Sequence, residues 1–190
     1  MLENLKNYNI ILGSGSPRRF ELLKGLHIDF EVKNIETDES YPDTLKGSEI
    51  PVFLAEKKSQ AFDIQNNTLL ITADTIVWTD NTIIGKPKNI ADAKRILQLL
   101  SGRVHQVISG VCLRTVVQKR VFKVISDVQF APLTNEEIEF YVNNFHPLDK
   151  AGAYGIQEWI GYIAVERISG SFYNIMGLPV QRLYTELKKF

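Results

Sequence analysis

The chain has 190 residues, of which 44% are hydrophobic and 23% charged, as in a globular protein with a sizeable core. Lysine plus arginine and aspartate plus glutamate both number 22, so the formal net charge is zero. Duplex-binding proteins usually carry a basic excess, so this balance disfavours nucleic acid as a partner. The single cysteine, Cys112 in an apolar run, excludes an internal disulfide and a zinc site built on paired cysteines.

The sequence carries no signal for export or membrane insertion. Residues 1–9 are too polar for a signal peptide, and no apolar run approaches the roughly 20 residues that span a bilayer. We therefore expect a cytoplasmic protein without a membrane partner.

The first half of the chain alternates strands and helices. A buried strand at 9–13 precedes a helix that is capped by Ser16, begins at Pro17 and ends at Gly25. The next elements expected are a strand at 27–33, an acidic loop at 36–47, a helix at 48–64, an apolar strand at 68–73, and a hairpin of strands 75–78 and 82–84.

The second half contains a long hairpin. The elements expected are a helix at 90–100, strands at 104–117 and 120–130, a helix from the capping box of Thr134 and Glu137 to Asn144, a strand at 161–167 and a closing helix at 178–190. This order predicts an α/β protein with a mixed sheet flanked by helices. We expect residues 1–190 to form a single domain of two closely packed lobes, with a ligand cleft between them.

Residues 13–19 join the first strand to a helix and form a candidate phosphate site. Helix N-termini attract phosphate, and Ser14 and Ser16 lie in a short glycine-containing turn that lets the backbone approach a ligand. Arg18 and Arg19 add bidentate donors. Positive charge in a first turn opposes the helix dipole, which favours a functional role over a solvated basic turn.

Lys58 and Asp74 are the next candidates. Lys58 lies among apolar positions of its helix, so it must snorkel to solvent, pair with an acid, or meet a ligand. Asp74 follows the apolar strand at 69–73, where a carboxylate suits Mg²⁺. The alternative for Asp74 is a turn residue that caps the next segment. The acidic residues at 36–39 could supply a second metal ligand or be a solvated loop.

Two further segments carry weaker signals. Pro87 stiffens the turn after Lys86 and could fix the direction of its ammonium group, although a surface turn is the more common interpretation. Gln157 ends a run of small residues at 151–157, and its amide could read a base edge. Together, arginines, lysines and a carboxylate indicate phosphate chemistry, which relies on positioning and charge stabilisation.

At these residues the sequence strongly resembles the Maf family of nucleoside triphosphate pyrophosphatases, from Ile10 to about Val180. The motifs that carry the resemblance are Ser14-Gly15-Ser16-Pro17-Arg18-Arg19, Ala73-Asp74-Thr75, Gly85-Lys86-Pro87, Leu100-Ser101-Gly102, Asp149-Lys150-Ala151-Gly152-Ala153-Tyr154-Gly155-Ile156-Gln157 and Met176-Gly177-Leu178-Pro179.

The resemblance implies an α/β/α fold like that of inosine triphosphate pyrophosphatases, with an elongated mixed sheet and a homodimer. It implies attack by water at the α-phosphorus with Mg²⁺, or a similar ion such as Mn²⁺ or Co²⁺, and it selects Glu39 within the acidic loop. The predicted residues are therefore Asp74, Lys58, Arg18 and Lys86 for catalysis, Ser14, Ser16, Arg18, Arg19, Thr75, Lys86 and Gln157 for substrate binding, and Asp74 and Glu39 for the metal.

The pair Asp74-Thr75 resembles the branch of the family that acts on dTTP and UTP rather than 7-methyl-GTP. Glu158 departs from the family pattern, in which glycine usually follows Gln157. We expect hydrolysis of dTTP and UTP to monophosphate and diphosphate, with modified pyrimidine triphosphates as further candidate substrates. The alternatives are a pyrophosphatase for 7-methyl-GTP or for non-canonical purine triphosphates, and a regulator of division arrest without catalysis.

Overall fold

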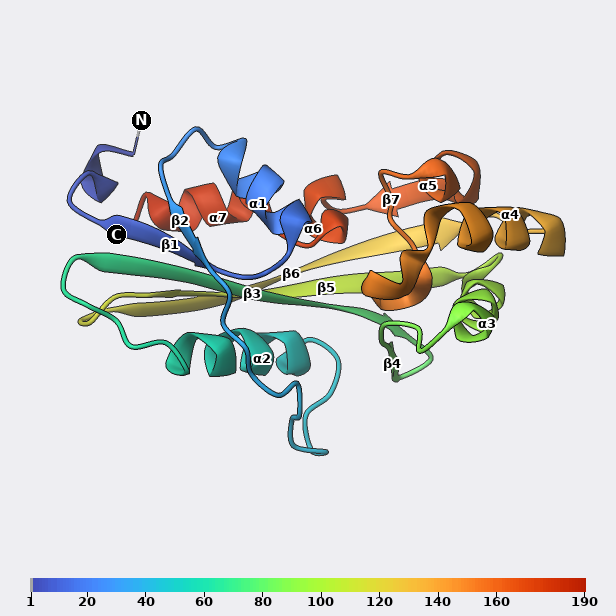
Figure 1. Cartoon of the computed structure of the whole chain (residues 1–190), viewed down its shortest axis with the longest axis horizontal. Helices are drawn as coiled ribbons and strands as arrows, with labels where there is room; N and C mark the ends of the chain where they lie inside the picture. Colours follow the sequence, from blue (N-terminus) through green and yellow to red (C-terminus); the bar gives the residue numbers. More distant parts are fainter. Residues whose placement is uncertain (1) are drawn as a thin grey trace. The chain divides into compact units, whose positions relative to one another are not determined.

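The computed structural model describes residues 2–190, whose strands form one mixed sheet (Figure 1). The order is β2-β1-β3-β5-β6-β7, with β4 paired to β3. β1 runs parallel to β2 and to β3, whereas β4 is antiparallel to β3 and β7 to β6. The strands are β1 (Asn9–Gly13), β2 (Glu31–Lys33), β3 (Thr68–Thr79), β4 (Thr82–Ile84), β5 (Val104–Arg114), β6 (Lys119–Phe130) and β7 (Val165–Ser169).

Helices flank this sheet, as the alternation of elements predicted. The α-helices are α1 (Pro17–Lys24), α2 (Glu49–Gln60), α3 (Ile90–Leu100), α4 (Asn135–Phe145), α5 (Trp159–Ala164), α6 (Phe172–Met176) and α7 (Val180–Leu187). Short 3-10 turns are η1 (Glu3–Leu5), η2 (Pro147–Asp149) and η3 (Ala151–Ala153). In the part of the chain that the structure describes, no helix is long and apolar enough to cross a membrane.

The chain divides into two compact units that share β3, β5 and β6. Unit 1 comprises Met1–Thr75, Ser109–Val124 and Gly177–Phe190, and unit 2 comprises Ile76–Ile108 and Ile125–Met176. The expectation of a single domain with a cleft between two lobes stays a prediction.

In unit 1, α1 and α7 lie on one face of the strands and α2 lies on the other (Figure 1). Leu12, Leu23, Leu54 and Leu70 are almost fully buried in this unit. A Cβ at Gly110 of β5 would lie 2.3 Å from the carbonyl oxygen of Pro51, so glycine lets the α2 backbone pack directly on the strand. This close approach fixes α2 over the sheet.

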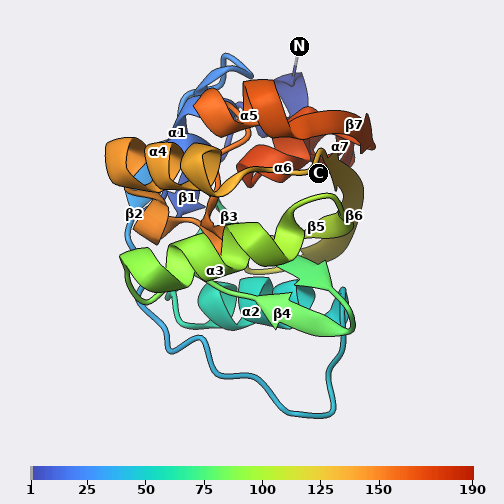
Figure 2. The ribbon, with the colours of Figure 1, turned by 90° about the vertical axis from the view of Figure 1, so that its right-hand side faces the viewer.

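Unit 2 has its own apolar core, to which α3, α4 and α5 contribute. Figure 2 shows α3 and α4 side by side, and Leu97 and Tyr141 from these helices are fully buried. The Asn89 side chain caps α3, and Thr134 and Glu137 form the predicted capping box of α4. Both helices begin where their local signals place them.

Two sequence expectations are wrong. The predicted strands at 68–73 and 75–78 are one strand, β3, because burial continues past Asp74 through Ile76 and Val77. The predicted strand at 161–167 is helical up to Ala164, and only Val165 onward joins β7. A Cβ at Gly161 would clash at 1.8 Å with the Ile156 carbonyl, so the chain turns tightly there.

Several boundaries also differ. Helix α2 ends at Gln60 rather than 64, β2 covers only Glu31–Lys33, and β5 ends at Arg114 so that residues 115–118 form the turn. Helix α6 has no counterpart among the predicted elements. Cys112 is free and buried, as expected for a small core residue.

Candidate active site

The candidate site lies where β1 ends beside β3. The last paired residues of these strands are Leu12 and Ile71, so β3 continues past β1 to Asp74 and Thr75. Ligands in α/β sheets bind outside the carboxyl ends of strands. The strand that ends at the site is therefore β1, and the expectation that Asp74 ends its own strand is wrong.

Asp74 and Thr75 are consecutive in β3, so their side chains point to opposite faces of the sheet. Asp74 meets Lys58 from α2, and Thr75 meets Arg19 from α1. Helices α1 and α2 flank opposite faces of unit 1 (Figure 1). Two cations from different helices thus converge on neighbouring residues of one strand.

Arg19 is held by three hydrogen bonds. Its Nε donates to the Gly177 carbonyl at 2.9 Å, Nη1 to Ser14 Oγ at 3.3 Å and Nη2 to Thr75 Oγ1 at 3.2 Å. These bonds use three of the five guanidinium N–H donors and leave two for a ligand. Burial lowers the pKa of Arg19, an effect that the charges of Asp74 and Glu39 oppose. The three hydrogen bonds therefore fix the direction of the guanidinium group.

Two residues of this network were missed by the sequence analysis as site residues. Ser109 Oγ lies 2.8 Å from Thr75 Oγ1, and the Gly177 carbonyl accepts from both Arg19 and Thr75. A serine inside a strand carries no local signal of function, and a carbonyl oxygen carries none for any residue type. Gly177 did lie in a motif of the family resemblance, and its φ of 117° is a conformation suited to glycine.

Lys58 pairs with both predicted metal ligands. Its Nζ lies 2.5 Å from Asp74 Oδ1 and 3.6 Å from Glu39 Oε1. The side chains of Lys58 and Asp74 are only 13% and 10% exposed, whereas that of Glu39 is 60% exposed. Of the three roles considered for Lys58, the structure shows pairing with an acid.

The neighbouring acid Asp38 belongs to a separate contact. Lys57 Nζ lies 2.7 Å from Asp38 Oδ1, and hydrogen bonds from Lys57 and Ser40 lower the pKa of Asp38. The loop at 36–47 therefore places Asp38 against Lys57 and Glu39 toward Lys58. Within residues 2–190, no group of three or more histidine, cysteine or acidic side chains forms a cage for a metal.

The turn before α1 is ordered by its own serines. Ser14 Oγ accepts from the backbone N–H of Ser16 at 3.2 Å, and Ser16 Oγ accepts from that of Arg19 at 3.4 Å. Ser16 is the N-cap of α1 and Pro17 occupies the first turn, as predicted. Arg18 lies next to Arg19 in this turn, and its charge lowers the pKa of Arg19 further.

Two comparisons with known proteins identify the family. The family model described as "Maf-like protein" matches residues 9–190. The chain is 57% identical to a dTTP/UTP pyrophosphatase of Phocaeicola vulgatus over 192 residues and 57% identical to one of Parabacteroides distasonis over 193 residues, with all of each chain covered. The chain belongs to the Maf family.

A solved structure shows the same fold. A HAM1 protein from Coxiella burnetii is 18% identical and matches 96% of this chain and all of its own, with a TM-score of 0.52. This likeness supports the α/β architecture with a sheet flanked by helices and carries no argument about substrates.

The predicted Maf site residues fall into two groups along the chain. Unit 1 contains Ser14, Ser16, Arg18, Arg19, Glu39, Lys58, Asp74 and Thr75. Unit 2 contains Lys86 and Gln157, both of which are exposed. The Gly85 carbonyl accepts from the Gly152 N–H at 3.1 Å, so the turn that carries Lys86 is tied to the small-residue loop that leads to Gln157.

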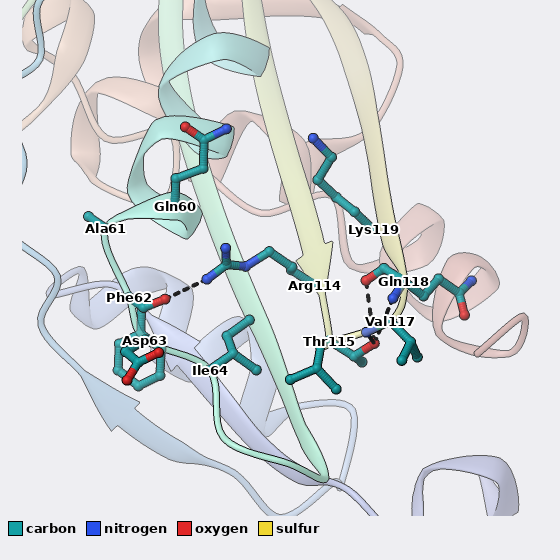
Figure 3. A pocket seen from close by; sticks show the side chains of 11 residues that line it. Gln60, Ala61, Phe62, Asp63, Ile64, Arg114, Thr115, Val117, Gln118 and Lys119 are labelled. Atoms are coloured by element: carbon teal, nitrogen blue, oxygen red, sulfur yellow. Dashed lines mark hydrogen bonds between the residues drawn. The ribbon is translucent and has the colours of Figure 1, made fainter.

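A pocket of unit 1, of about 670 Å³, contains none of the predicted Maf site residues (Figure 3). It lies between the end of α2 and the turn that joins β5 to β6. Arg114 points into it and donates to the Phe62 carbonyl at 2.5 Å. This contact ties the end of α2 to the strand, which is a structural role.

Proposed function

We propose that this chain hydrolyses dTTP and UTP to the nucleoside monophosphate and diphosphate. Full-length relatives at 57% identity carry the name dTTP/UTP pyrophosphatase, which supports this reaction class. The observation that carries the proposal is the pair of contacts on β3, Lys58 with Asp74 and Arg19 with Thr75. Phosphoryl chemistry needs such positioned charges more than it needs a covalent catalyst.

The triphosphate is bound at the turn before α1. Arg19 offers its two remaining N–H donors, and Arg18 adds a second charge beside the helix N-terminus. Because Ser14, Thr75 and Gly177 already accept hydrogen bonds from the Arg19 guanidinium group, little side-chain entropy is lost when phosphate oxygens bind. Lys86 supplies a further cation to the phosphates.

Asp74 is the catalytic carboxylate, which takes the proton of the attacking water. Lys58 at 2.5 Å fixes the direction of its Oδ1 and offers positive charge where negative charge grows on the α-phosphate. The pair is largely buried, which strengthens its electrostatic effect relative to an exposed pair.

A divalent ion, Mg²⁺ or a similar ion such as Mn²⁺ or Co²⁺, is part of this proposal. The carboxylates of Asp74 and Glu39 both pair with the Lys58 ammonium group and offer hard oxygen ligands there. Mg²⁺ typically uses one or two carboxylates together with substrate phosphates and water. These residues therefore fit such an ion and would hold it. When bound, the ion neutralises charge on the phosphate oxygens.

Gln157 is proposed to select the base. The Gln157 amide offers one acceptor and two donors, which match the carbonyl and N–H edge of a uracil-type ring. A site that hydrogen-bonds its ligand rejects analogues that leave its polar groups unpaired. Thymine and uracil differ by one methyl group, so both are accepted.

The test is a panel of dTTP, UTP, ATP, GTP, ITP and 7-methyl-GTP with Mg²⁺, with the products identified. We expect kcat/KM for dTTP and UTP to exceed that for each purine by about 10² or more, with diphosphate as a product. A preference for 7-methyl-GTP or ITP would support the alternative substrate class. The absence of diphosphate release from every triphosphate would support a non-catalytic regulator.

The chain is further proposed to act as a cytoplasmic homodimer with nucleoside triphosphates as its only ligands besides the metal. Light scattering on the purified protein tests the dimer, and fractionation of cells tests the compartment. If the purified protein is a fully active monomer, the proposed dimer is refuted and the assignment of the reaction stands.

A further inference from the structure

The loop at 150–158, which precedes α5, is closed by one carboxylate. Glu158 Oε1 lies 3.1 Å from Lys150 Nζ at the start of the loop. Its Oε2 accepts from the Tyr141 hydroxyl, which itself accepts from the Gly155 N–H at 3.0 Å. A single side chain thus ties both ends of the loop to α4.

These contacts lie in a largely buried place. The Tyr141 side chain is fully buried, and the side chains of Lys150 and Glu158 are only 10% and 21% exposed. Burial and the bond to Glu158 raise the pKa of the Tyr141 hydroxyl, so it remains a donor. Lys150 also pairs with Asp149 at 2.7 Å, and that acid is 61% exposed.

The carboxylate rests against the loop backbone. A Cβ at Gly155 would lie 2.7 Å from Glu158 Cδ, so the glycine leaves the space that the carboxyl group occupies. Inside the loop, Gly152 and Ala153 have φ values of 74° and 56°, and a left-handed alanine is unfavourable unless its surroundings hold it. The loop therefore depends on contacts from outside to keep this conformation.

Gln157 is the exposed residue between Gly155 and the anchored Glu158. Its backbone position is fixed by the turn in which the Glu158 N–H donates to the Gly155 carbonyl at 2.9 Å. Because Glu158 follows Gln157 directly, we expect a change that loosens the Glu158 side chain to shift the Gln157 amide.

We propose that Glu158 is a positioning residue for base selection, acting through the Lys150 and Tyr141 contacts on the loop that carries Gln157. The inference rests on the proposed function, in which Gln157 meets the base. Glu158 itself does not touch the substrate. Its carboxylate places a negative charge 3.1 Å from the Lys150 ammonium in a largely buried place, whereas the other acid on that ammonium, Asp149, is 61% exposed.

The test compares Glu158→Gln with Glu166→Gln, an exposed glutamate of β7 that accepts from Gln129 at 2.8 Å. Each variant is assayed with dTTP, with ATP and with methyl triphosphate, which has no base. For Glu158→Gln we expect the ratio of kcat/KM for dTTP over ATP to fall about tenfold, through KM for dTTP, the scale of one lost charge-assisted contact. Methyl triphosphate hydrolysis and the Glu166→Gln ratio stay at wild-type values.

Lys150→Met tests the same contact from the other side. It should lower the dTTP/ATP ratio by a similar factor, and the double variant should lower it no further, because both changes break one interaction. If Glu158→Gln does not fold, the dTTP/ATP ratio of Lys150→Met tests the positioning role by itself.

The outcomes separate this inference from the proposed function. A wild type that cleaves dTTP and ATP equally refutes both the proposed preference and the inference. A wild-type preference that Gln157→Ala abolishes, and that Glu158→Gln and Lys150→Met leave intact, overturns the inference alone. Equal loss of rate on dTTP, ATP and methyl triphosphate, with a lower Tm, assigns Glu158 a merely structural role.

Discussion

Replacing Lys58 with methionine tests the central contact of the site. Methionine keeps most of the length and apolar volume of the lysine stem but removes the ammonium that lies 2.5 Å from Asp74 Oδ1. The helix backbone and its apolar neighbours are unaffected by this change. The loss is therefore confined to the charge that faces Asp74 and Glu39.

The expected loss of activity exceeds the loss of stability. Removing one preorganised electrostatic contact from a transition state lowers kcat by about 10²–10³, or roughly 3–4 kcal/mol. Breaking a buried pair costs about 3–5 kcal/mol of stability, because it leaves an uncompensated charge. For Lys58→Met we expect a smaller loss of stability, about 2 kcal/mol. The charge of Arg19 still acts on Asp74, and the side chains of Lys58 and Asp74 are both partly exposed.

The neighbouring Lys57 provides a matched control. It belongs to the same helix and also pairs with an acid of the same loop, but its partner Asp38 is 68% exposed. Lys57→Met should keep both kcat and Tm, since exposed pairs contribute little. Diphosphate release from dTTP at saturating Mg²⁺ and urea unfolding provide the two measurements. If Lys58→Met unfolds readily but keeps kcat within about threefold of Lys57→Met, the electrostatic argument is wrong.

Three further changes have defined outcomes. Asp74→Asn should lower kcat about 10²–10³-fold while the chain stays folded, and near-wild-type turnover on dTTP would rule out its role. Gln157→Ala should reduce the dTTP/ATP ratio of kcat/KM more than the rate on ATP, and an unchanged ratio would remove it from base selection. Burial lowers the pKa of His105 to about 4 in the folded chain. Between this value and the usual histidine pKa of ~6.5, His105 takes up a proton in the unfolded chain and stays neutral in the folded chain. Stability contributed by neutral His105 should therefore fall by about 3 kcal/mol from pH 7 to 4, and urea unfolding of His105→Gln should lack this part of the decline.

Most of the architecture followed from signals that are complete within short segments. Helix α3 has the predicted bounds, and the capping box of Thr134 and Glu137 forms at α4. Strand β1 coincides with the predicted range 9–13, and Ser16 caps α1. In each case the residues that decide the element lie within one turn or one strand of it.

The errors arose where distant partners decide the structure. Asp74 is typical of a turn and separated the two predicted strands, but Lys58 and Ser109 satisfy Asp74 and Thr75 inside the continuous strand β3. These partners are 16 and 34 residues away in the sequence, so no local pattern reveals them. The same holds for α5, which begins directly after Glu158, a residue whose carboxylate accepts from Tyr141, 17 residues away in the sequence.

Three charged candidates of the site were found because they contradict local stability. Arg18 and Arg19 oppose a helix dipole, and Lys58 interrupts an apolar face. Ser109 and the Gly177 carbonyl do not oppose local stability, so no local pattern marks them as site residues, although Gly177 lies in a motif of the family resemblance. Their part in holding Arg19 depends on a fold that brings together residues 158 positions apart.

The alternation of β3 explains why the site needs two helices. Consecutive residues of a strand face opposite sides of the sheet, so Asp74 and Thr75 make their direct contacts with different cations. Lys58 from α2 and Arg19 from α1 each take one side, and β1 ends before either residue and leaves that edge of β3 without a β1 partner. Shifting β3 by one residue would exchange the two faces, placing the carboxylate against Arg19 and the hydroxyl against Lys58. The register that pairs Leu12 with Ile71 is therefore as much a part of the proposed chemistry as the charged groups themselves.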